Sequence, residues 1–100
     1  MDSVILGTEL KYAIELTSQG FSMDEDDFTI YIMKGRNIVK EYAKSDLRVE
    51  NGTYLLCINT EEIGLGSFDV AAKAEVPDDH FPDGFRTEIE RVQAFNVKKL

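Results

Sequence analysis

The feature of this sequence that most limits its fold is a two-residue alternation of apolar and polar side chains. The clearest alternating segments are 9–16, 28–33 and 68–76. A period of two places every second side chain on one face of an extended strand, so these segments predict half-buried β-strands. Segments 38–42, 47–50 and 54–58 are short, apolar and bounded by turn residues, which predicts three further strands.

Two turns between these segments have characteristic sequences. Lys34-Gly35-Arg36-Asn37 predicts a hairpin loop between 28–33 and 38–42. Asn51-Gly52 predicts a two-residue hairpin turn, because both residues tolerate positive φ angles. The segment 54–58 that follows is an unbroken apolar run, which predicts a central strand covered on both faces. Cys57 lies inside this run and is therefore expected to be a buried, inert thiol.

The last segment, Thr87–Lys99, is compatible with two structures. Thr87 and Glu90 fit a capping box, which is typical of a short terminal helix. Val92–Val97 instead predicts a strand with one register change, as a β-bulge would produce. We favour the strand, because the preceding segments would otherwise lack a closing partner. The sequence thus predicts one all-β domain over residues 1–100, a β-sandwich of about seven antiparallel strands.

Composition excludes several classes of function. The 100 residues carry a net charge of −8, and an acidic chain repels nucleic-acid backbones and anionic membranes. One cysteine and one histidine exclude an internal disulfide and the metal sites built from several thiolates or imidazoles. No signal-peptide core is present near Met1, and no apolar run approaches the roughly 18 residues that span a bilayer. We therefore expect neither export nor membrane insertion.

Asp24–Asp27 is a run of four acids, and clustered carboxylates suit hard cations such as calcium. The spacing differs from an EF-hand: counted from Asp24, position 6 is Thr29 instead of glycine and position 12 is Gly35 instead of glutamate. The simpler interpretation is a solvated loop between two strands. Whether the run binds a cation stays open.

His80 is the one side chain suited to general-base chemistry near neutral pH, and neighbouring carboxylates could orient it. The sequence supplies no nucleophile, since it contains no Gly-x-Ser-x-Gly elbow. The residues around His80, including Phe81-Pro82 and Asp83-Gly84, are typical of turns. We expect a structural loop here.

Two other patterns resemble parts of known sites. Gly64–Ser67 lacks the Gly-Lys-Ser/Thr ending of a phosphate-binding loop and precedes a strand, which favours a tight turn. The acid pairs Glu61-Glu62 and Glu88 with Glu90 would need to face each other across a cleft to hydrolyse a glycoside, and spacing does not show that. We therefore expect no catalytic residues, no bound metal and no cofactor, and a protein that is not an enzyme.

Charge is distributed unevenly along the chain. Segment 34–48 holds five bases and two acids, a net +3, which leaves −11 on the remaining residues. The bases are Lys34, Arg36, Lys40, Lys44 and Arg48. A basic hairpin on an acidic body would orient copies head to tail or dock an acidic neighbour. Alternatively, these lysines protect a sheet edge against aggregation.

Several motifs follow one another in an order that resembles a known family. They are Phe28–Gly35, Lys44–Leu47, Asn51–Tyr54, Asn59–Thr60 and Gly64–Phe68. In this order they look like the immunoglobulin-like domain at the N-terminus of phage baseplate upper proteins. The ending Val76–Glu88 is similar to stretches of phage-derived structural proteins. The resemblance implies an immunoglobulin-like β-sandwich that acts as a non-enzymatic structural module in a prophage tail or baseplate.

The resemblance also implies protein partners, either copies of the chain itself or other tail components, and a cytoplasmic location until assembly into a virion. It supplies no functional side chains. Phe68 stands where an immunoglobulin fold often has the tyrosine of a tyrosine corner. A carbohydrate-binding or adhesin-like module is the alternative, although the chain offers four tyrosines and no tryptophan for stacking on sugars. Partner identity, oligomeric state and binding surface stay open.

Overall fold

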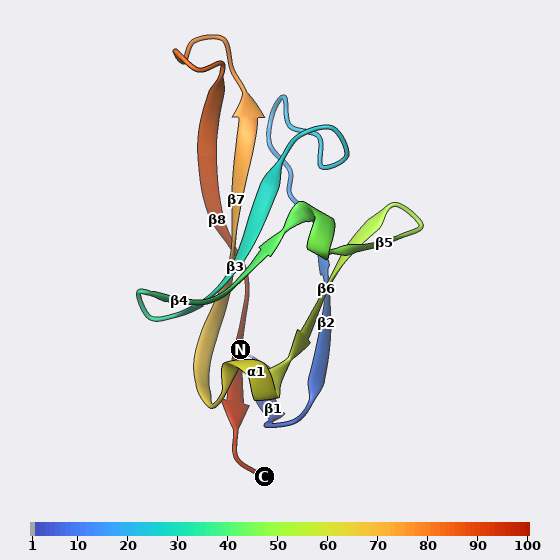
Figure 1. Cartoon of the computed structure of the whole chain (residues 1–100), viewed down its shortest axis with the longest axis vertical. Helices are drawn as coiled ribbons and strands as arrows, with labels where there is room; N and C mark the ends of the chain where they lie inside the picture. Colours follow the sequence, from blue (N-terminus) through green and yellow to red (C-terminus); the bar gives the residue numbers. More distant parts are fainter. Residues whose placement is uncertain (1) are drawn as a thin grey trace.

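The computed structural model describes residues 2–100, and these form eight strands in two sheets (Figure 1). The strands are β1 (Asp2–Ile5), β2 (Glu9–Ile14), β3 (Phe28–Lys34), β4 (Asn37–Ala43), β5 (Arg48–Glu50), β6 (Thr53–Asn59), β7 (Gly66–Pro77) and β8 (Phe85–Lys98). A 3-10 turn, η1 (Lys44–Asp46), and one helical turn, α1 (Thr60–Ile63), connect strands. The prediction of an all-β chain is confirmed.

The five-stranded sheet has the order β1-β8-β7-β3-β4, and the three-stranded sheet has the order β2-β6-β5. Neighbouring strands are antiparallel except for β1, which pairs in parallel with Phe95–Lys98 of β8. About seven antiparallel strands were expected from the sequence. The additional strand is β1, whose four residues have no alternating pattern and find their partner at the opposite end of the chain.

The predicted alternation places one face of each sheet in a shared core. The fully buried large side chains are Phe28, Phe68, Phe95, Ile30, Ile32, Leu56, Ile58, Val70 and Val76. Across the two sheets, the ring centroids of Phe28 and Tyr54 lie 5.6 Å apart, and those of Tyr12 and Phe95 lie 6.0 Å apart. Burial of these side chains is the main favourable term in folding.

The predicted cover on both faces of segment 54–58 is wrong. This strand, β6, is central, as expected, because it lies between β2 and β5. Its side chains nevertheless alternate between buried and half-buried or exposed, and Cys57 is exposed. The reason is that only one sheet packs against β6, so its outer face meets solvent. An apolar run indicates a strand but does not show how many layers cover it.

The C-terminal segment is a strand, as favoured from the sequence, and no helix forms over Thr87–Lys99. Val70 of β7 lies opposite Gln93, and the next residue, Ala71, lies opposite Arg91. Val92 is therefore an extra residue in β8, which confirms the expected register change. Strand β7 ends at Pro77.

The Asn51-Gly52 hairpin is confirmed as well. Asn51 has a φ of 52° and Gly52 a φ of 78°, which is the pair of positive angles that a tight hairpin turn requires. The turn joins Glu50 to Thr53, which lie opposite each other.

The molecule is elongated, with principal extents of 50 × 32 × 20 Å, because β7 and β8 are much longer than the strands of the other sheet. Figure 1 shows that the segment between β2 and β3 runs beside the upper part of the five-stranded sheet, where the three-stranded sheet does not reach. Leu16 of this segment is buried, and Phe21 and Met23 pack against the core. No helix among residues 2–100 is long and apolar enough to cross a membrane.

Candidate functional site

The acidic run Asp24–Asp27 lies in the segment between β2 and β3, and the carboxylates of Asp24 and Asp26 have separate partners. The Tyr54 hydroxyl donates a hydrogen bond to Asp24 Oδ1 at 2.8 Å, and the Ser22 backbone N–H donates to Asp26 Oδ2 at 2.8 Å. The bond to Asp24, together with burial, raises the pKa of the Tyr54 hydroxyl. These contacts tie the loop to β6.

A cationic side chain, Lys44, already binds the backbone of this loop. The Lys44 ammonium donates to the backbone carbonyls of Asp24 at 2.8 Å and Asp26 at 3.0 Å. Carbonyl oxygens of this kind are what a bound calcium ion would use, and Lys44 holds two of them. The arrangement matches the expected structural loop, in which a lysine from the basic segment supplies the positive charge.

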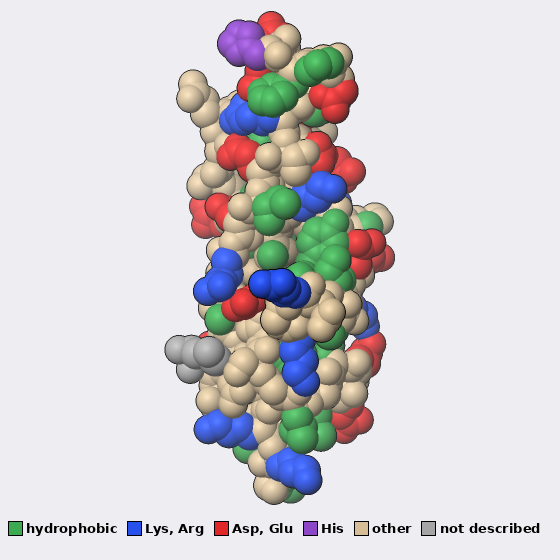
Figure 2. All heavy atoms as spheres, turned by 90° about the vertical axis from the view of Figure 1, so that its left-hand side faces the viewer, with side chains coloured by type: hydrophobic (Ala, Val, Ile, Leu, Met, Phe, Trp, Pro, Cys, Tyr) green, Lys and Arg blue, Asp and Glu red, His purple; other side chains and the backbone are tan. Residues whose placement is uncertain are grey.

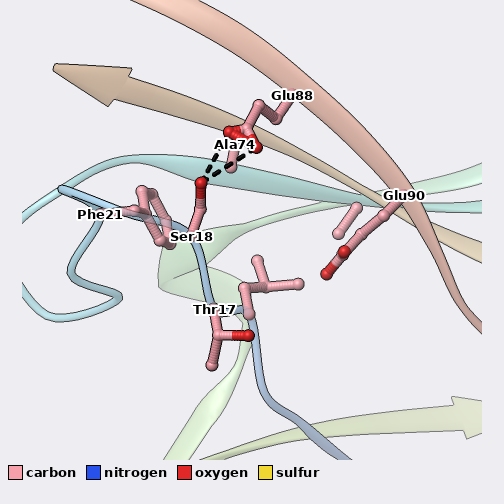
Figure 3. Close-up of a pocket in the computed structure, with 8 residues that line it drawn as sticks. Thr17, Ser18, Phe21, Ala74, Glu88 and Glu90 are labelled. Atoms are coloured by element: carbon pink, nitrogen blue, oxygen red, sulfur yellow. Dashed lines mark hydrogen bonds between the residues drawn. The ribbon is translucent and has the colours of Figure 1, made fainter. Parts of the chain in front are cut away.

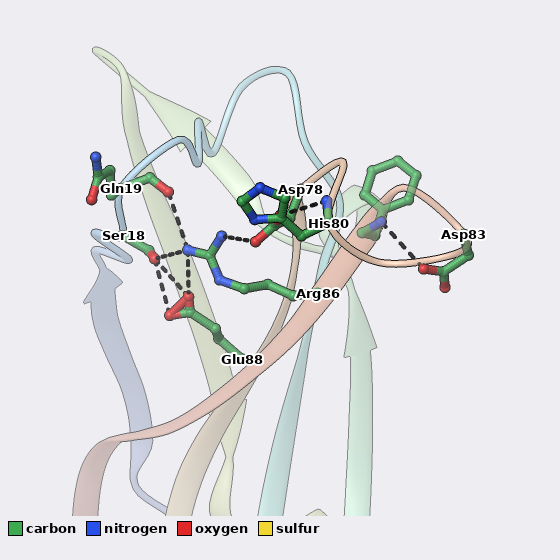
Figure 4. A network of polar contacts seen from close by, with 8 residues as sticks. Ser18, Gln19, Asp78, His80, Asp83, Arg86 and Glu88 are labelled. Atoms are coloured by element: carbon green, nitrogen blue, oxygen red, sulfur yellow. Dashed lines mark hydrogen bonds and ion pairs between the residues drawn. The ribbon is translucent and has the colours of Figure 1, made fainter.

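His80 lies at the tip of the loop between β7 and β8, with 91% of its side chain exposed. Its backbone N–H donates to Asp78 Oδ1 at 3.0 Å, and Asp78 Oδ2 accepts from Arg86 at 3.0 Å (Figure 4). Arg86 also bonds Ser18 and Glu88, so the network links the loop to the segment after β2. His80 takes part through its backbone N–H, and its exposed ring lies beside the same carboxylate, with 3.6 Å between Nδ1 and Asp78 Oδ1.

Asp78, Asp79 and His80 form the one group within residues 2–100 whose side chains offer three clustered metal-ligating atoms, all within 4.8 Å of one another. The Asp78 carboxylate is already used inside the protein, because it accepts hydrogen bonds from His80 and Arg86. The guanidinium charge of Arg86 at 3.0 Å also opposes a second cation there.

The Asp78 network predicts a pH effect on stability. The His80 backbone N–H, followed by Arg86, lowers the pKa of Asp78 below its usual 3.8. A lowered folded-state pKa means that this stabilisation is present above the unfolded-state value and is lost as pH falls through the folded one. We expect Asp78→Asn to cost stability at pH 7 and to cost less near pH 2, as measured by urea unfolding across that range.

The matched control is Asp79→Asn, since this neighbouring carboxylate is exposed. It is expected to leave the unfolding free energy unchanged at both pH values. A constant difference between wild type and Asp78→Asn from neutral to acid pH would contradict the assignment of Asp78.

Glu88 and Glu90 project from β8 into a small cavity that Thr17, Ser18 and Phe21 close from the other side (Figure 3). The Ser18 hydroxyl bonds both oxygens of the Glu88 carboxylate, at 2.7 and 3.0 Å. The cavity measures about 20 Å³, which is room for one water molecule and not for a sugar ring. The structure thus brings this predicted acid pair together, but on one side of a water-sized space.

The other predicted pair, Glu61 and Glu62, is in α1, where Glu62 forms an ion pair with Lys40. Gly64 and Leu65 turn the chain from α1 into β7, which begins at Gly66. The Lys34 ammonium donates to the Leu65 carbonyl at 3.0 Å, and a Cβ atom added at Gly66 would lie 2.9 Å from Lys34 Cε. The turn therefore binds the ammonium group of Lys34, whereas a phosphate-binding loop binds an anion.

The basic segment runs from Lys34 at the end of β3 through β4 and η1 to Arg48 at the start of β5, and β4 is one edge of the five-stranded sheet. Lys40 lies over the Tyr42 ring at 5.5 Å, and its ion pair with Glu62 raises the pKa of its ammonium group. Arg36 in the turn and Arg48 in β5 are exposed. The segment keeps a net positive charge after these internal contacts.

Strand β4 also exposes apolar side chains at this edge. Ile38 is 57% exposed and Val39 is 39% exposed. Ile32 pairs with Lys40 and Met33 with Ile38, so Val39 is an additional residue that bulges from the ladder. Figure 2 shows hydrophobic side chains exposed between basic and acidic ones on the side of the molecule to which the β3–β4 hairpin projects. Exposed apolar groups on an unpaired strand are typical of surfaces that contact another chain.

Sequence reasoning did not find a second unpaired edge, which is in β8. Strand β1 pairs only with Phe95–Lys98, so residues 85–94 have no strand on the side away from β7 among residues 2–100. Ile89 in this stretch is 69% exposed. The one signal in the sequence is an isoleucine between two glutamates, which alone is also compatible with a half-buried strand.

The two packed sheets and these two edges define the class of the molecule. It is an all-β protein whose five-stranded sheet is open and, within the described residues 2–100, has unpaired backbone along β4 and along residues 85–94 of β8. Comparisons of the chain with protein-family models, curated proteins and solved structures found no match.

Proposed function

We propose that this protein is a non-enzymatic structural or interaction module that binds an extended segment of a protein partner along β4. The observation that carries the proposal is the exposed edge of β4, where Ile38 and Val39 lie beside unpaired backbone in a basic segment. An extended peptide that joins such an edge gains backbone hydrogen bonds, and alternate side chains set its specificity. The charge of the segment favours an acidic partner strand.

The same features of β4 can also be interpreted as protection of the sheet edge against unwanted strand pairing. Lysines and β-bulges on edge strands prevent unwanted pairing, and β4 has both, at Lys40 and Val39. We favour binding because a protected edge is usually polar, whereas this one exposes two branched apolar side chains. A single experiment with a defined peptide distinguishes the two interpretations.

The resemblance to the immunoglobulin-like domain of phage baseplate upper proteins supports an assembly role of this kind. Under this proposal the two sheets form an immunoglobulin-like β-sandwich, and the partners are tail or baseplate components or other copies of the chain. The coding neighbourhood tests the phage context: genes for tail, portal or capsid proteins are expected beside this one, and a neighbourhood without them would contradict it.

The positions of the tyrosines give little support to a carbohydrate-binding function, because such sites use exposed aromatic rings. Tyr54 is buried, and Tyr12 packs against Phe95 in the core. Tyr31 and Tyr42 are half-buried on different strands. We therefore do not propose a sugar site.

Chemical-shift titration of the ¹⁵N-labelled protein tests the β4 proposal. The probe is a synthetic peptide of alternating glutamate and valine, long enough to pair with β4. We expect the amide signals of Asn37–Ala43 to shift in a saturable manner, because the peptide adds a strand to this edge. The control is a peptide of equal length with lysine in place of glutamate, which should leave β4 unshifted. Equal responses to both peptides, or shifts confined to other strands, would overturn the proposal.

A further inference from the structure

The backbone of β8 between Phe85 and Ala94 has hydrogen-bonding groups that point away from β7. The Phe85 N–H donates to the Asp83 carboxylate at 3.2 Å, so it faces the free side. Alternate residues of an antiparallel strand direct their backbone groups to the same side. Because the bulge comes later, at Val92, the N–H and C=O groups of Thr87, Ile89 and Arg91 also face the free side. Figure 1 shows only β7 beside this upper part of β8.

The outward groups of β4 follow from the same alternation. The Ala43 N–H donates to Asp46 Oδ2 at 2.8 Å, and so faces away from β3. Glu41 is two residues earlier with no bulge between them, so its N–H and C=O groups face away from β3 too. Strand β4 has seven residues, fewer than the free stretch of β8.

The directions of the strands permit the two edges to join. From β8 through β7 and β3 to β4, each neighbour is antiparallel to the last. Strand β4 of a second copy in the same orientation is therefore antiparallel to β8 of the first, with the inner faces of both sheets on the same side. Pairing extends one five-stranded sheet into the next.

We propose that the chain self-associates head to tail, with β4 of one copy adding as a strand to the free edge of β8 in the next. This inference rests on the proposed function of β4 and names its partner as a second copy. Such a heterologous contact uses two different surfaces of each copy, so it generates rings or filaments.

One register of the two edges sets opposite charges beside each other, with Lys40 able to contact Glu90 in addition to Glu62. Lys40 lies opposite Ile32, and Glu90 lies opposite Ala72; both partners are buried, so Lys40 and Glu90 are on the inner face. Placing Glu41 opposite Ile89 sets Lys40 directly opposite Glu90. The exposed side chain of Glu41 then lies diagonal to Arg91 on the outer face. Opposite charges across adjacent strands stabilise the pair.

Two proline variants block the two edges separately. Ile89→Pro removes an N–H from the free side of β8, and Glu41→Pro removes one from the free side of β4. Proline is tolerated in an edge strand when its missing N–H faces outward, so each variant keeps its internal ladder. The control is Val49→Pro on β5, an edge of the other sheet, where the residue is 52% exposed.

Sedimentation velocity over a concentration series measures the association. The wild-type chain should form species larger than its 11.3 kDa monomer, more weakly in about 1 M salt, where the Debye length is about 3 Å. Each edge variant should lower the association constant by about tenfold or more, because backbone hydrogen bonds of the new strand pair are lost. Val49→Pro should associate as wild type.

Mixing the two edge variants gives the decisive result. Ile89→Pro retains a free β4 and Glu41→Pro retains a free β8, so an equimolar mixture should form a one-to-one dimer at concentrations where each variant alone stays monomeric. Circular dichroism confirms that each variant is folded. Glu90→Lys, which leaves the backbone hydrogen-bonding groups intact, should also associate more weakly than the wild type.

The outcomes separate this inference from the proposed function. A wild-type chain that stays monomeric at every concentration, a mixture without dimers, or a folded edge variant that associates as wild type would overturn the head-to-tail contact. If the glutamate peptide still shifts β4 in that case, the function proposed for β4 stands with another partner. If the peptide fails as well, both are wrong.

Discussion

Replacing Phe95 with alanine is expected to lower the free energy of unfolding by about 3 to 5 kcal/mol. Phe95 is fully buried in β8, its ring stacks on Phe68 at a centroid distance of 5.5 Å, and it also contacts Tyr12 of the other sheet. The truncation therefore opens a cavity between the two sheets. Small domains are stable by only about 5 to 15 kcal/mol, so this change removes a large part of the total.

Urea unfolding followed by circular dichroism measures this loss. Phe85→Ala is the matched control on the same strand, since Phe85 is 45% exposed, and it should change stability by less than about 0.5 kcal/mol. A loss below about 1 kcal/mol for Phe95→Ala, with an unchanged urea dependence, would show that the sheets do not pack around this ring.

Ile58→Ala is the second large effect, with an expected loss of about 2 to 5 kcal/mol. Ile58 is 2% exposed on β6, opposite Leu10 of β2, and its side chain packs in the core. Removing its methyl and methylene groups leaves a space that the central strand of the three-stranded sheet cannot readily fill. The same urea experiment measures the loss.

The adjacent residue supplies the control for β6. Cys57→Ala is expected to be nearly neutral, within about 0.5 kcal/mol, because Cys57 lies on the exposed face. If Cys57→Ala cost as much as Ile58→Ala, both faces of β6 would be covered in solution and the assignment of its outer face would be wrong.

Local patterns predicted most strands because burial on one face leaves a trace in each segment. Ile30 and Ile32 are buried on alternate positions of β3, and the same holds for Val70, Ala72 and Ala74 of β7. The Asn51-Gly52 turn was also predictable, because asparagine and glycine tolerate the positive φ angles that both turn positions require.

Features set by distant parts of the chain were not predictable. Strand β1 depends on the meeting of Asp2–Ile5 with the end of β8, and among residues 2–100 no other strand lies beside residues 85–94 on the side away from β7. The exposure of Cys57 depends on the number of layers over β6, which the apolar run does not encode. The free edge at residues 85–94 is the feature on which the proposed head-to-tail association depends.

The candidate site was predicted in part. The charge of segment 34–48 pointed to the hairpin, and the structure places it at a sheet edge. The internal partners of its lysines were not visible, since Lys44 binds carbonyls of Asp24 and Asp26, and Lys40 pairs with Glu62. The complementary edge of β8 requires the sheet order, which no single segment contains.

Amide hydrogen exchange at low and high protein concentration tests the central claim most directly. The N–H groups of Ile89 in β8 and Glu41 in β4 face the free edges, so both should exchange rapidly in dilute protein and become protected together as copies pair. Tyr42, whose N–H faces β3, should be protected at both concentrations. Exchange at Ile89 and Glu41 that stays fast at every concentration, or protection at only one of the two edges, would contradict head-to-tail pairing of β4 with β8.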